Sequence, residues 1–310
     1  MNITLFTAIC SFFIILILAQ CMVYVVRKRH PDKDWTELTQ RMQTWWLIVL
    51  VFVLAISTPQ VVSLIIFGFI SFLALKEFFT MIPTRYSDNT PLLWAYVSIP
   101  IQYYFVGAEW FGMFIVFIPV YVFLFLPTVM VLIGDTKGFL HSAATLHWGV
   151  MTTVFAISHV AFLNVLGDDK STGALMVIYL VALTECNDIA QYLWGKTLGK
   201  RKIIPKVSPN KTVEGLLGGI ATTMVLALIL GPILTPMTFS PLGLLHCLLA
   251  GLLIGVFGFI GDVVMSAVKR DIGVKDSGKL LPGHGGILDR LDSLIYTAPI
   301  FFHFIYYYYF

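Results

Sequence analysis

Long apolar runs separated by short polar stretches make up most of this 310-residue chain. A helix needs about 20 apolar residues to cross the hydrocarbon core of a bilayer. The run at 43–57 is short and Thr58 and Pro59 follow it, so 43–82 could instead form a helical hairpin or one kinked span. The pattern predicts about ten membrane-spanning helices, with eight or nine as the alternative counts, over residues 3–26, 43–57, 60–82, 91–107, 110–133, 143–166, 173–195, 215–234, 242–267 and 291–310.

Composition supports this pattern, because 58% of the residues are hydrophobic and 12% are charged. A soluble domain carries about twice that charged fraction, so the chain is predicted to be an all-α, polytopic integral membrane bundle. No polar stretch is long enough to close a core of its own. We expect one continuous membrane domain with two halves of different character: residues 1–172 are apolar spans, and residues 173–310 carry most of the polar chemistry.

The basic residues fall almost entirely on one side of the predicted topology. Alternating spans leave Lys170 alone on the other side, so 19 of the 20 Lys and Arg residues share one face. Because basic loops stay in the cytoplasm, this face is predicted to be cytoplasmic and both chain ends to lie outside. Segments 31–42 and 83–90 are expected to be short interfacial connectors.

Residues 261–292 concentrate charge in an otherwise apolar chain. They hold five carboxylates, five Lys or Arg residues and a Pro-Gly-His-Gly-Gly turn. Charge is costly in or beside a bilayer, so such a cluster is a candidate functional site. Carboxylates suit hard divalent cations and bases suit phosphates. The segment therefore predicts metal-assisted phosphate chemistry at a membrane surface.

Three acids in this segment are candidates to share a cation. Asp289 and Asp292 stand three residues apart after the glycine turn and would project from one face of a helix. Simple capping of that helix is the alternative, because acids are favoured at a helix N-terminus. Asp262 lies near the inner end of its span, where an ion pair with Lys269 or Arg270 is the alternative role.

Two further stretches carry polar side chains. Glu185, Asn187 and Asp188 lie within a span, where a metal site and a polar contact between helices remain equally open. The basic loop 195–214 is dense in side chains that bind phosphate, although its charge could simply serve an inside-positive loop or anionic lipid heads. Its candidates are Lys206, Ser208, Lys211 and Thr212.

Two smaller features have simple local explanations. His284 lies between glycines that permit close backbone approach to a ligand, so it could donate to a phosphate or only order the turn. The adjacent Lys76 and Glu77 are expected to form a local surface pair.

These residues resemble the phosphatidate cytidylyltransferase (CDP-diacylglycerol synthase) family. Its pattern runs Ser-x-aliphatic-Lys-Arg, four residues, Lys-Asp-x-small, then apolar-Pro-x-His-Gly-Gly-x-x-Asp-Arg-x-Asp. Two positions depart from the family, Val213 where Trp is usual and Gln191 where a small residue is usual, which leaves the lipid acceptor open. The similarity covers roughly 182–292, including Asn187-Asp188 and 208–215. The matching positions span 27 residues: Ser266, Lys269, Arg270, Lys275, Asp276, Gly278, Leu281, Pro282, His284, Gly285, Gly286, Asp289, Arg290 and Asp292.

The resemblance implies an enzyme that converts CTP and phosphatidate to CDP-diacylglycerol and pyrophosphate on the cytoplasmic face of the bacterial inner membrane. It implies magnesium, as one or two divalent cations, with a monovalent second cation left open. The expected metal ligands are Asp262, Asp289 and Asp292, with Asp188 completing the shell. The expected catalytic residues are Lys269, Arg270, Lys275, Asp276, His284 and Arg290. The expected substrate-binding residues are Lys206, Ser208, Lys211, Thr212, Ser266, Gly285 and Gly286.

The partners expected are CTP, phosphatidate or a similar lipid phosphate, and membrane lipid, with no nucleic acid and with a homodimer left open. Alternative functions are a cytidylyltransferase acting on another lipid phosphate and a CTP-dependent kinase of a lipid alcohol. A transporter or channel is less favoured, because the polar residues collect at one face and the chain has no internal repeat.

Overall fold

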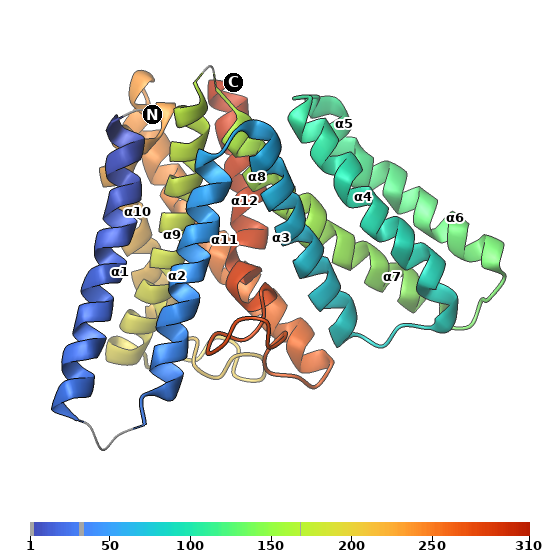
Figure 1. Cartoon of the computed structure of the whole chain (residues 1–310), viewed down its shortest axis with the longest axis horizontal. Helices are drawn as coiled ribbons and strands as arrows, with labels where there is room; N and C mark the ends of the chain where they lie inside the picture. The colour runs from blue at the N-terminus through green and yellow to red at the C-terminus, as the bar shows by residue number, and fades with distance from the viewer. Residues whose placement is uncertain (1–2, 31–33, 168) are drawn as a thin grey trace.

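A computed structural model describes residues 3–30, 34–167 and 169–310, and across these ranges the chain is a bundle of helices without strands (Figure 1). The bundle contains ten helical rods, several of them built from consecutive segments. Their bounds are α1 Ile3–Arg29, α2 Thr36–Ser57, α3 Gln60–Met81, α4 Asn89–Gly107, α5 Phe111–Val116 continuing through π-helical Phe117–Val122 into α6 Phe123–Ile133, α7 Phe139–Val150 continuing through π-helical Met151–Phe155 into α8 Ala156–Val165, α9 Lys170–Leu198, α10 Val213–Leu234, α11 Gly243–Asp271 and α12 Leu288–Tyr309.

The all-α membrane bundle predicted from the apolar runs is confirmed. Each predicted span corresponds to one rod, and eight rods are long and apolar enough to cross a membrane. The two others are α4, and α12, which starts with charged residues and ends in four tyrosines. The number of spans therefore lies within the predicted range of eight to ten.

The region 43–82 forms two separate helices. The chain breaks at Thr58 and Pro59, and α2 and α3 then run in opposite directions (Figure 1). The predicted connector 31–42 was too long, because α2 already begins at Thr36. The carboxylate of Asp34 accepts the Thr36 N–H at 2.9 Å and so satisfies a free donor at the helix start. Residues 31–33 of that connector lie outside the described residues.

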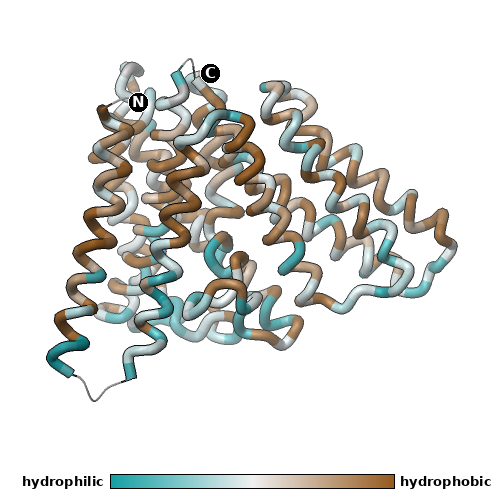
Figure 2. Tube along the Cα trace, viewed as in Figure 1, coloured by the Kyte–Doolittle hydropathy of each residue, from teal (hydrophilic) through white to brown (hydrophobic). Residues whose placement is uncertain are grey.

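The start of α1 and the end of α12 lie together at one end of the bundle, and helices α1, α3, α6, α9 and α11 finish at the opposite end, where the loops that follow them begin (Figure 1). Most of the basic residues that the structure describes lie in these loops and in the helix ends beside them. Polar residues are correspondingly gathered at this end, while the middle of the helices is apolar (Figure 2). The arrangement agrees with the alternation deduced from the positions of charge.

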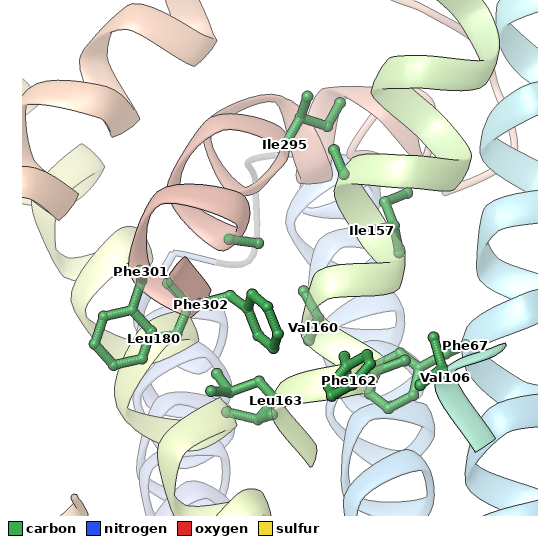
Figure 3. Packing of buried hydrophobic residues seen from close by; sticks show 14 of the residues in the cluster. Phe67, Val106, Ile157, Val160, Phe162, Leu163, Leu180, Ile295, Phe301 and Phe302 are labelled. Carbon is green, nitrogen blue, oxygen red and sulfur yellow. The ribbon is translucent and has the colours of Figure 1, made fainter. Parts of the chain in front are cut away.

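Helix α8 lies at the centre of the packing. Its residues from Ala156 to Asn164 are buried, and Phe162 and Leu163 lie in the hydrophobic cluster with Phe302 of α12 and Leu180 of α9 (Figure 3). In contrast, 6% of the residues in the most apolar stretch of α1 are buried by the rest of the protein, so α1 lies at the edge of the bundle. The central position of α8 ties the C-terminal helices to α3 and α4.

Candidate active site

Three helices approach one another closely through glycines of α11. A Cβ atom at Gly258 would lie 3.0 Å from Nδ2 of Asn187 in α9, and one at Gly261 would lie 2.5 Å from the main-chain oxygen of Asp292 in α12. Small residues permit such contacts between membrane helices. The two glycines therefore bring the polar residues of α11 beside those of α9 and α12.

An acidic cluster forms where these helices meet. It consists of Asp188 of α9, Asp262 of α11 and Asp292 of α12, which lie close enough to interact electrostatically. The Ser293 hydroxyl donates to Oδ2 of Asp188 at 2.7 Å. Oδ1 of Asp188 is buried and has no partner among the described residues. Because buried polar atoms are normally hydrogen-bonded, this oxygen is available to a ligand.

Two lysines reach the site from different elements. Nζ of Lys211 lies 2.5 Å from Oδ2 of Asp262, and Nζ of Lys269 lies 2.7 Å from Oδ1 of Asp289. The Ser266 hydroxyl donates to the other oxygen of Asp262 at 3.3 Å. The ion pair considered for Asp262 with Lys269 or Arg270 was therefore assigned to the wrong partner, since the loop before α10 supplies the cation.

Asp289 is bound by protein groups on both carboxylate oxygens. Lys269 contacts Oδ1, while Oδ2 accepts the main-chain N–H groups of Ser277 at 2.9 Å and Gly286 at 3.0 Å. This side chain thus holds both ends of the glycine-rich turn. Neither of these N–H groups belongs to α12, so the side chain fixes the loop before the helix and does not cap the helix itself. Its role as a metal ligand stays a prediction.

The loop 272–287 folds back on itself through glycines with positive φ. Gly283 and Gly285 have φ of 75° and 83°, values that side chains rarely adopt. His284 between them packs edge-on against Trp45 of α2 at 5.6 Å between ring centroids. Burial, together with the positive charge of Arg290, lowers the pKa of His284 below its ordinary value of 6.5, so its ring is mostly neutral at pH 7.

The remaining predicted site residues lie around this cluster. The guanidinium of Arg270 donates to the main-chain oxygen of Val207 at 3.4 Å and so joins the two polar loops. The Thr212 hydroxyl is buried and accepts the Gly215 N–H at 3.1 Å, which caps α10. Ser208 is half-buried. Solvent-exposed positions on the same face are Lys206, Arg270, Lys275, Asp276 and Arg290.

Four residues of α2 and α3 contact the glycine-rich turn and were missed from the sequence. Glu77 was interpreted as a surface partner of Lys76, but it is buried and receives hydrogen bonds from the loop and from α12. An acid inside an apolar span was the available signal. The other three are Arg41, Thr44 and Trp45, which contact Gly283, Pro282 and His284.

Comparison with known proteins identifies the family. The profile of the cytidylyltransferase family matches residues 39–308, most of the chain. The chain belongs to the cytidylyltransferase family. It is therefore a nucleotidyltransferase with several apolar membrane helices.

Several relatives of this cytidylyltransferase are similar over different lengths. Uncharacterized protein YnbB of Escherichia coli is 53% identical over 97% of this chain and 98% of its own length. Phosphatidate cytidylyltransferase of Bacillus subtilis is 34% identical over 86% of this chain and 97% of its own length. The enzyme of the same name from Staphylococcus aureus is 36% identical over 48% of this chain and 58% of its own length.

One of the two departures from the family pattern touches the site of this cytidylyltransferase directly. Oε1 of Gln191 accepts a hydrogen bond from Nζ of Lys211 at 3.2 Å, and this lysine also pairs with Asp262. Val213 is the first residue of α10, next to the capping Thr212. Gln191 therefore helps to fix the lysine that enters the acidic cluster.

The oxygen atoms of the acidic cluster are ligands of the kind that magnesium prefers. Within the described ranges, no group of three or more His, Cys, Asp or Glu side chains is arranged tightly enough to hold an ion by itself. Magnesium, however, binds through one or two carboxylates and completes its shell with water and substrate phosphates. The unpartnered Oδ1 of Asp188 beside Asp262 and Asp292 supplies hard oxygen ligands of this kind. The cytidylyltransferase site fits a magnesium ion that arrives with a phosphate substrate.

Proposed function

We propose that this cytidylyltransferase transfers the CMP group of CTP to phosphatidate, or to a similar lipid phosphate, and releases pyrophosphate. The product with phosphatidate is CDP-diacylglycerol. The observation that carries the proposal is the acidic cluster of Asp188, Asp262 and Asp292, which Lys211 and Lys269 border at the basic end of the bundle. The names of the Bacillus and Staphylococcus relatives support phosphatidate as the acceptor.

The proposed reaction needs no protein nucleophile. An oxygen of the lipid phosphate, ionised near neutral pH, forms a bond to the α-phosphorus of CTP. The bond between that phosphorus and the bridging oxygen to the β-phosphate breaks, and pyrophosphate leaves with the electron pair. The work of the protein is therefore to position two anions and to neutralise their charge.

The basic side chains fall into two groups, one near α11 and α12 and one on the loop before α10. Lys269 beside Asp289 and the exposed Arg270, Lys275 and Arg290 neutralise the triphosphate and the departing pyrophosphate. Lys206, Ser208 and Lys211 on the other loop bind a phosphate of the lipid or the nucleotide.

Acidic residues complete the proposed assignment. Asp188, Asp262 and Asp292, with Asp289 beside them, would hold magnesium, which when bound neutralises phosphate oxygens. Asp276 and His284 border the same site on the glycine-rich loop, where His284 is mostly neutral and can donate a hydrogen bond to a phosphate.

The membrane arrangement suits a lipid substrate. Apolar helices lead to one polar end of the bundle (Figure 2). In the proposed complex the acyl chains remain among the apolar helices and the phosphate reaches this polar end. By the positive-inside rule this end lies on the cytoplasmic side of a bacterial inner membrane, where CTP is present. Both chain ends then lie on the outer side.

Position-specific labelling of CTP tests the proposed function. Purified protein in lipid nanodiscs receives phosphatidate and magnesium with CTP labelled at either the α- or the γ-phosphate. Transfer of the α-label to lipid, with release of labelled pyrophosphate from γ-labelled CTP, is the expected result. Transfer of the γ-label to an added lipid alcohol would instead identify a kinase. Substrate flux across liposomes that hold the protein, without nucleotide consumption, would identify a transporter. A panel of other lipid phosphates defines the acceptor.

A further inference from the structure

Glu77 of α3 binds the glycine-rich loop through three hydrogen bonds. Its Oε1 accepts the hydroxyl of Ser277 at 2.6 Å and the N–H of Leu288 at 2.9 Å, and its Oε2 accepts the N–H of Ile287 at 2.9 Å. The residue is 8% exposed. A buried carboxylate is stable only when its oxygens are satisfied in this way. Glu77 thus joins α3 to a loop and a helix that are distant from it in the sequence.

The helix start supplies two of these donors. The first N–H groups of an α-helix have no partner within the helix, and the residue preceding α12 provides no side-chain cap. Glu77 satisfies Ile287 and Leu288 from another helix, and its negative charge is favourable at the N-terminal end of the helix dipole. The cap of α12 is therefore supplied by α3.

Two glycines of the loop create space for the carboxylate. A Cβ atom at Gly278 would lie 2.7 Å from Oε2 of Glu77, and one at Gly286 would lie 2.1 Å from Oε1. Both distances are too short for a real carbon atom. The glycine at 278 leaves room for the Glu77 carboxylate, and the glycine at 286 leaves room for this carboxylate and for the Ser277 hydroxyl beside it.

The same loop residues connect Glu77 to the acidic side chain at the start of α12. Ser277 donates its hydroxyl to Glu77 and its N–H to Asp289. Gly286 donates its N–H to Asp289, and the next residue, Ile287, donates to Glu77. The two carboxylates thus both bind Ser277 and the adjacent residues 286 and 287, and Asp289 pairs with Lys269 at the site.

Helix α2 supports the tip of the loop. Nε of Arg41 donates to the main-chain oxygen of Gly283 at 3.1 Å, and the Thr44 hydroxyl donates to that of Pro282 at 2.7 Å. The loop is therefore attached to the N-terminal half of the chain at two separate places.

We propose that Glu77 is a positioning residue of the active site, which presents the loop 277–287 and the first turn of α12 to the nucleotide. This inference rests on the proposed function. Glu77 has no cationic partner within ion-pair distance in the part of the chain that the structure describes. The hydrogen bonds that its carboxylate accepts all come from this loop and from the start of α12. Without it, the loop would have to be ordered by the incoming CTP, which weakens binding.

Three variants in lipid nanodiscs test this role. Glu77→Gln keeps the volume and one acceptor oxygen, Glu77→Leu removes both acceptors, and Ser71→Ala is the matched control. Ser71 is buried on the same helix and its hydroxyl contacts that of Tyr103 at 2.8 Å, away from the loop. If Glu77→Gln fails to accumulate, Ser277→Ala removes a single one of the donors and takes its place.

The first measurement is hydrogen–deuterium exchange of the peptide that contains residues 277–288. We expect faster exchange in both Glu77 variants and wild-type exchange in Ser71→Ala. The second is the apparent KM for CTP, which a mere loss of folded protein does not change. We expect it to rise by about tenfold in Glu77→Gln and further in Glu77→Leu, because a hydrogen bond to a charged group is lost.

The outcomes separate the two proposals. A wild-type protein that makes no CMP-bearing lipid overturns the proposed function, and the positioning role fails with it. An active wild type whose Glu77 variants retain both its KM for CTP and its exchange rate overturns the positioning role alone. A fall in maximal rate with unchanged KM and exchange, or an equal effect of Ser71→Ala, also contradicts it, because either pattern would mean general destabilisation.

Discussion

Lys211 and Asp262 are separated by 51 positions in the sequence, yet Nζ of the lysine lies 2.5 Å from Oδ2 of the aspartate. Both side chains are largely buried, at 19% and 23% exposed. Such a pair between a loop and a helix fixes where the loop lies. The basic loop before α10 is therefore held against α11 by a contact made at the acidic cluster itself.

A double-mutant cycle measures this contact. We expect Lys211→Met and Asp262→Asn each to lower thermal stability in detergent, with a coupling of about 1 kcal/mol between them, because partners in direct contact are not additive. Lys200→Met is the control, since Lys200 is exposed in the same loop. Additive effects of the two changes would show that the pair does not hold the loop.

Asp292→Asn is expected to reduce turnover by about two orders of magnitude with little change in stability. The asparagine keeps the size of the side chain but lacks the charge that stabilises the reacting phosphates electrostatically. Initial rates with CTP and phosphatidate, together with the unfolding temperature, test this expectation. Asp271→Asn, an exposed acid at the end of α11, serves as the control. Turnover equal to the wild type would exclude Asp292 from the chemistry.

Asp289→Asn should differ from Asp292→Asn by losing stability as well as turnover. The wild-type carboxylate pairs with Lys269 and accepts two main-chain N–H groups. Loss of one partner of such a buried pair costs about 3–5 kcal/mol at most, so the unfolding temperature should fall clearly below that of Asp292→Asn. Equal unfolding temperatures for the two variants would contradict the structural role of Asp289.

The lowered pKa of His284 predicts a loss of stability in acid. Burial and Arg290 disfavour its charged form, so the unfolded chain binds a proton at a higher pH than the folded protein. The stability that neutral His284 contributes is fully present above pH 6.5, its ordinary pKa. It is lost as the pH falls from there toward the pKa of His284 in the folded protein. Unfolding temperatures between about pH 7.5 and about pH 5.5 should therefore fall less steeply for His284→Gln than for the wild type. Parallel curves would disprove this.

Gly261→Ala tests the close approach of α11 and α12. The added Cβ atom would lie 2.5 Å from the main-chain oxygen of Asp292, whereas one at Gly112 would lie 3.9 Å from the Trp110 ring nitrogen. We expect a loss of about 1–3 kcal/mol for Gly261→Ala from overpacking and little change for Gly112→Ala. Denaturation in mild detergent measures both. Equal stability of the two variants would mean that the helices separate at no cost.

Apolar runs were sufficient to predict the ten rods, because a membrane-spanning helix needs about 20 consecutive apolar residues. They placed the start of α2 too late, since residues 36–41 are mostly polar; the Asp34 carboxylate satisfies the first N–H there. Asp289 and Asp292 could be assigned to one helix start from their spacing.

Contacts between distant segments could not be predicted. The partner of Glu77 is 200 positions away at Ser277, and the neighbouring Lys76, which is exposed, gave a misleading local explanation. The partner of Asp262 was misassigned for the same reason, because Lys269 and Arg270 are close in sequence whereas Lys211 is close in space. Spacing predicts which residues share a helix, and the packing of helices decides which of them meet.

The capping of α12 by α3 has a consequence for how the chain can be divided. A fragment of residues 173–310 would keep every residue of the recognisable motif but would lack the acceptor for the first N–H groups of its last helix. Its turn would also lose the anchors on α2. The turn and the start of α12 therefore take hydrogen-bond partners from α2 and α3, and a shortened or split protein would need these two helices to keep them.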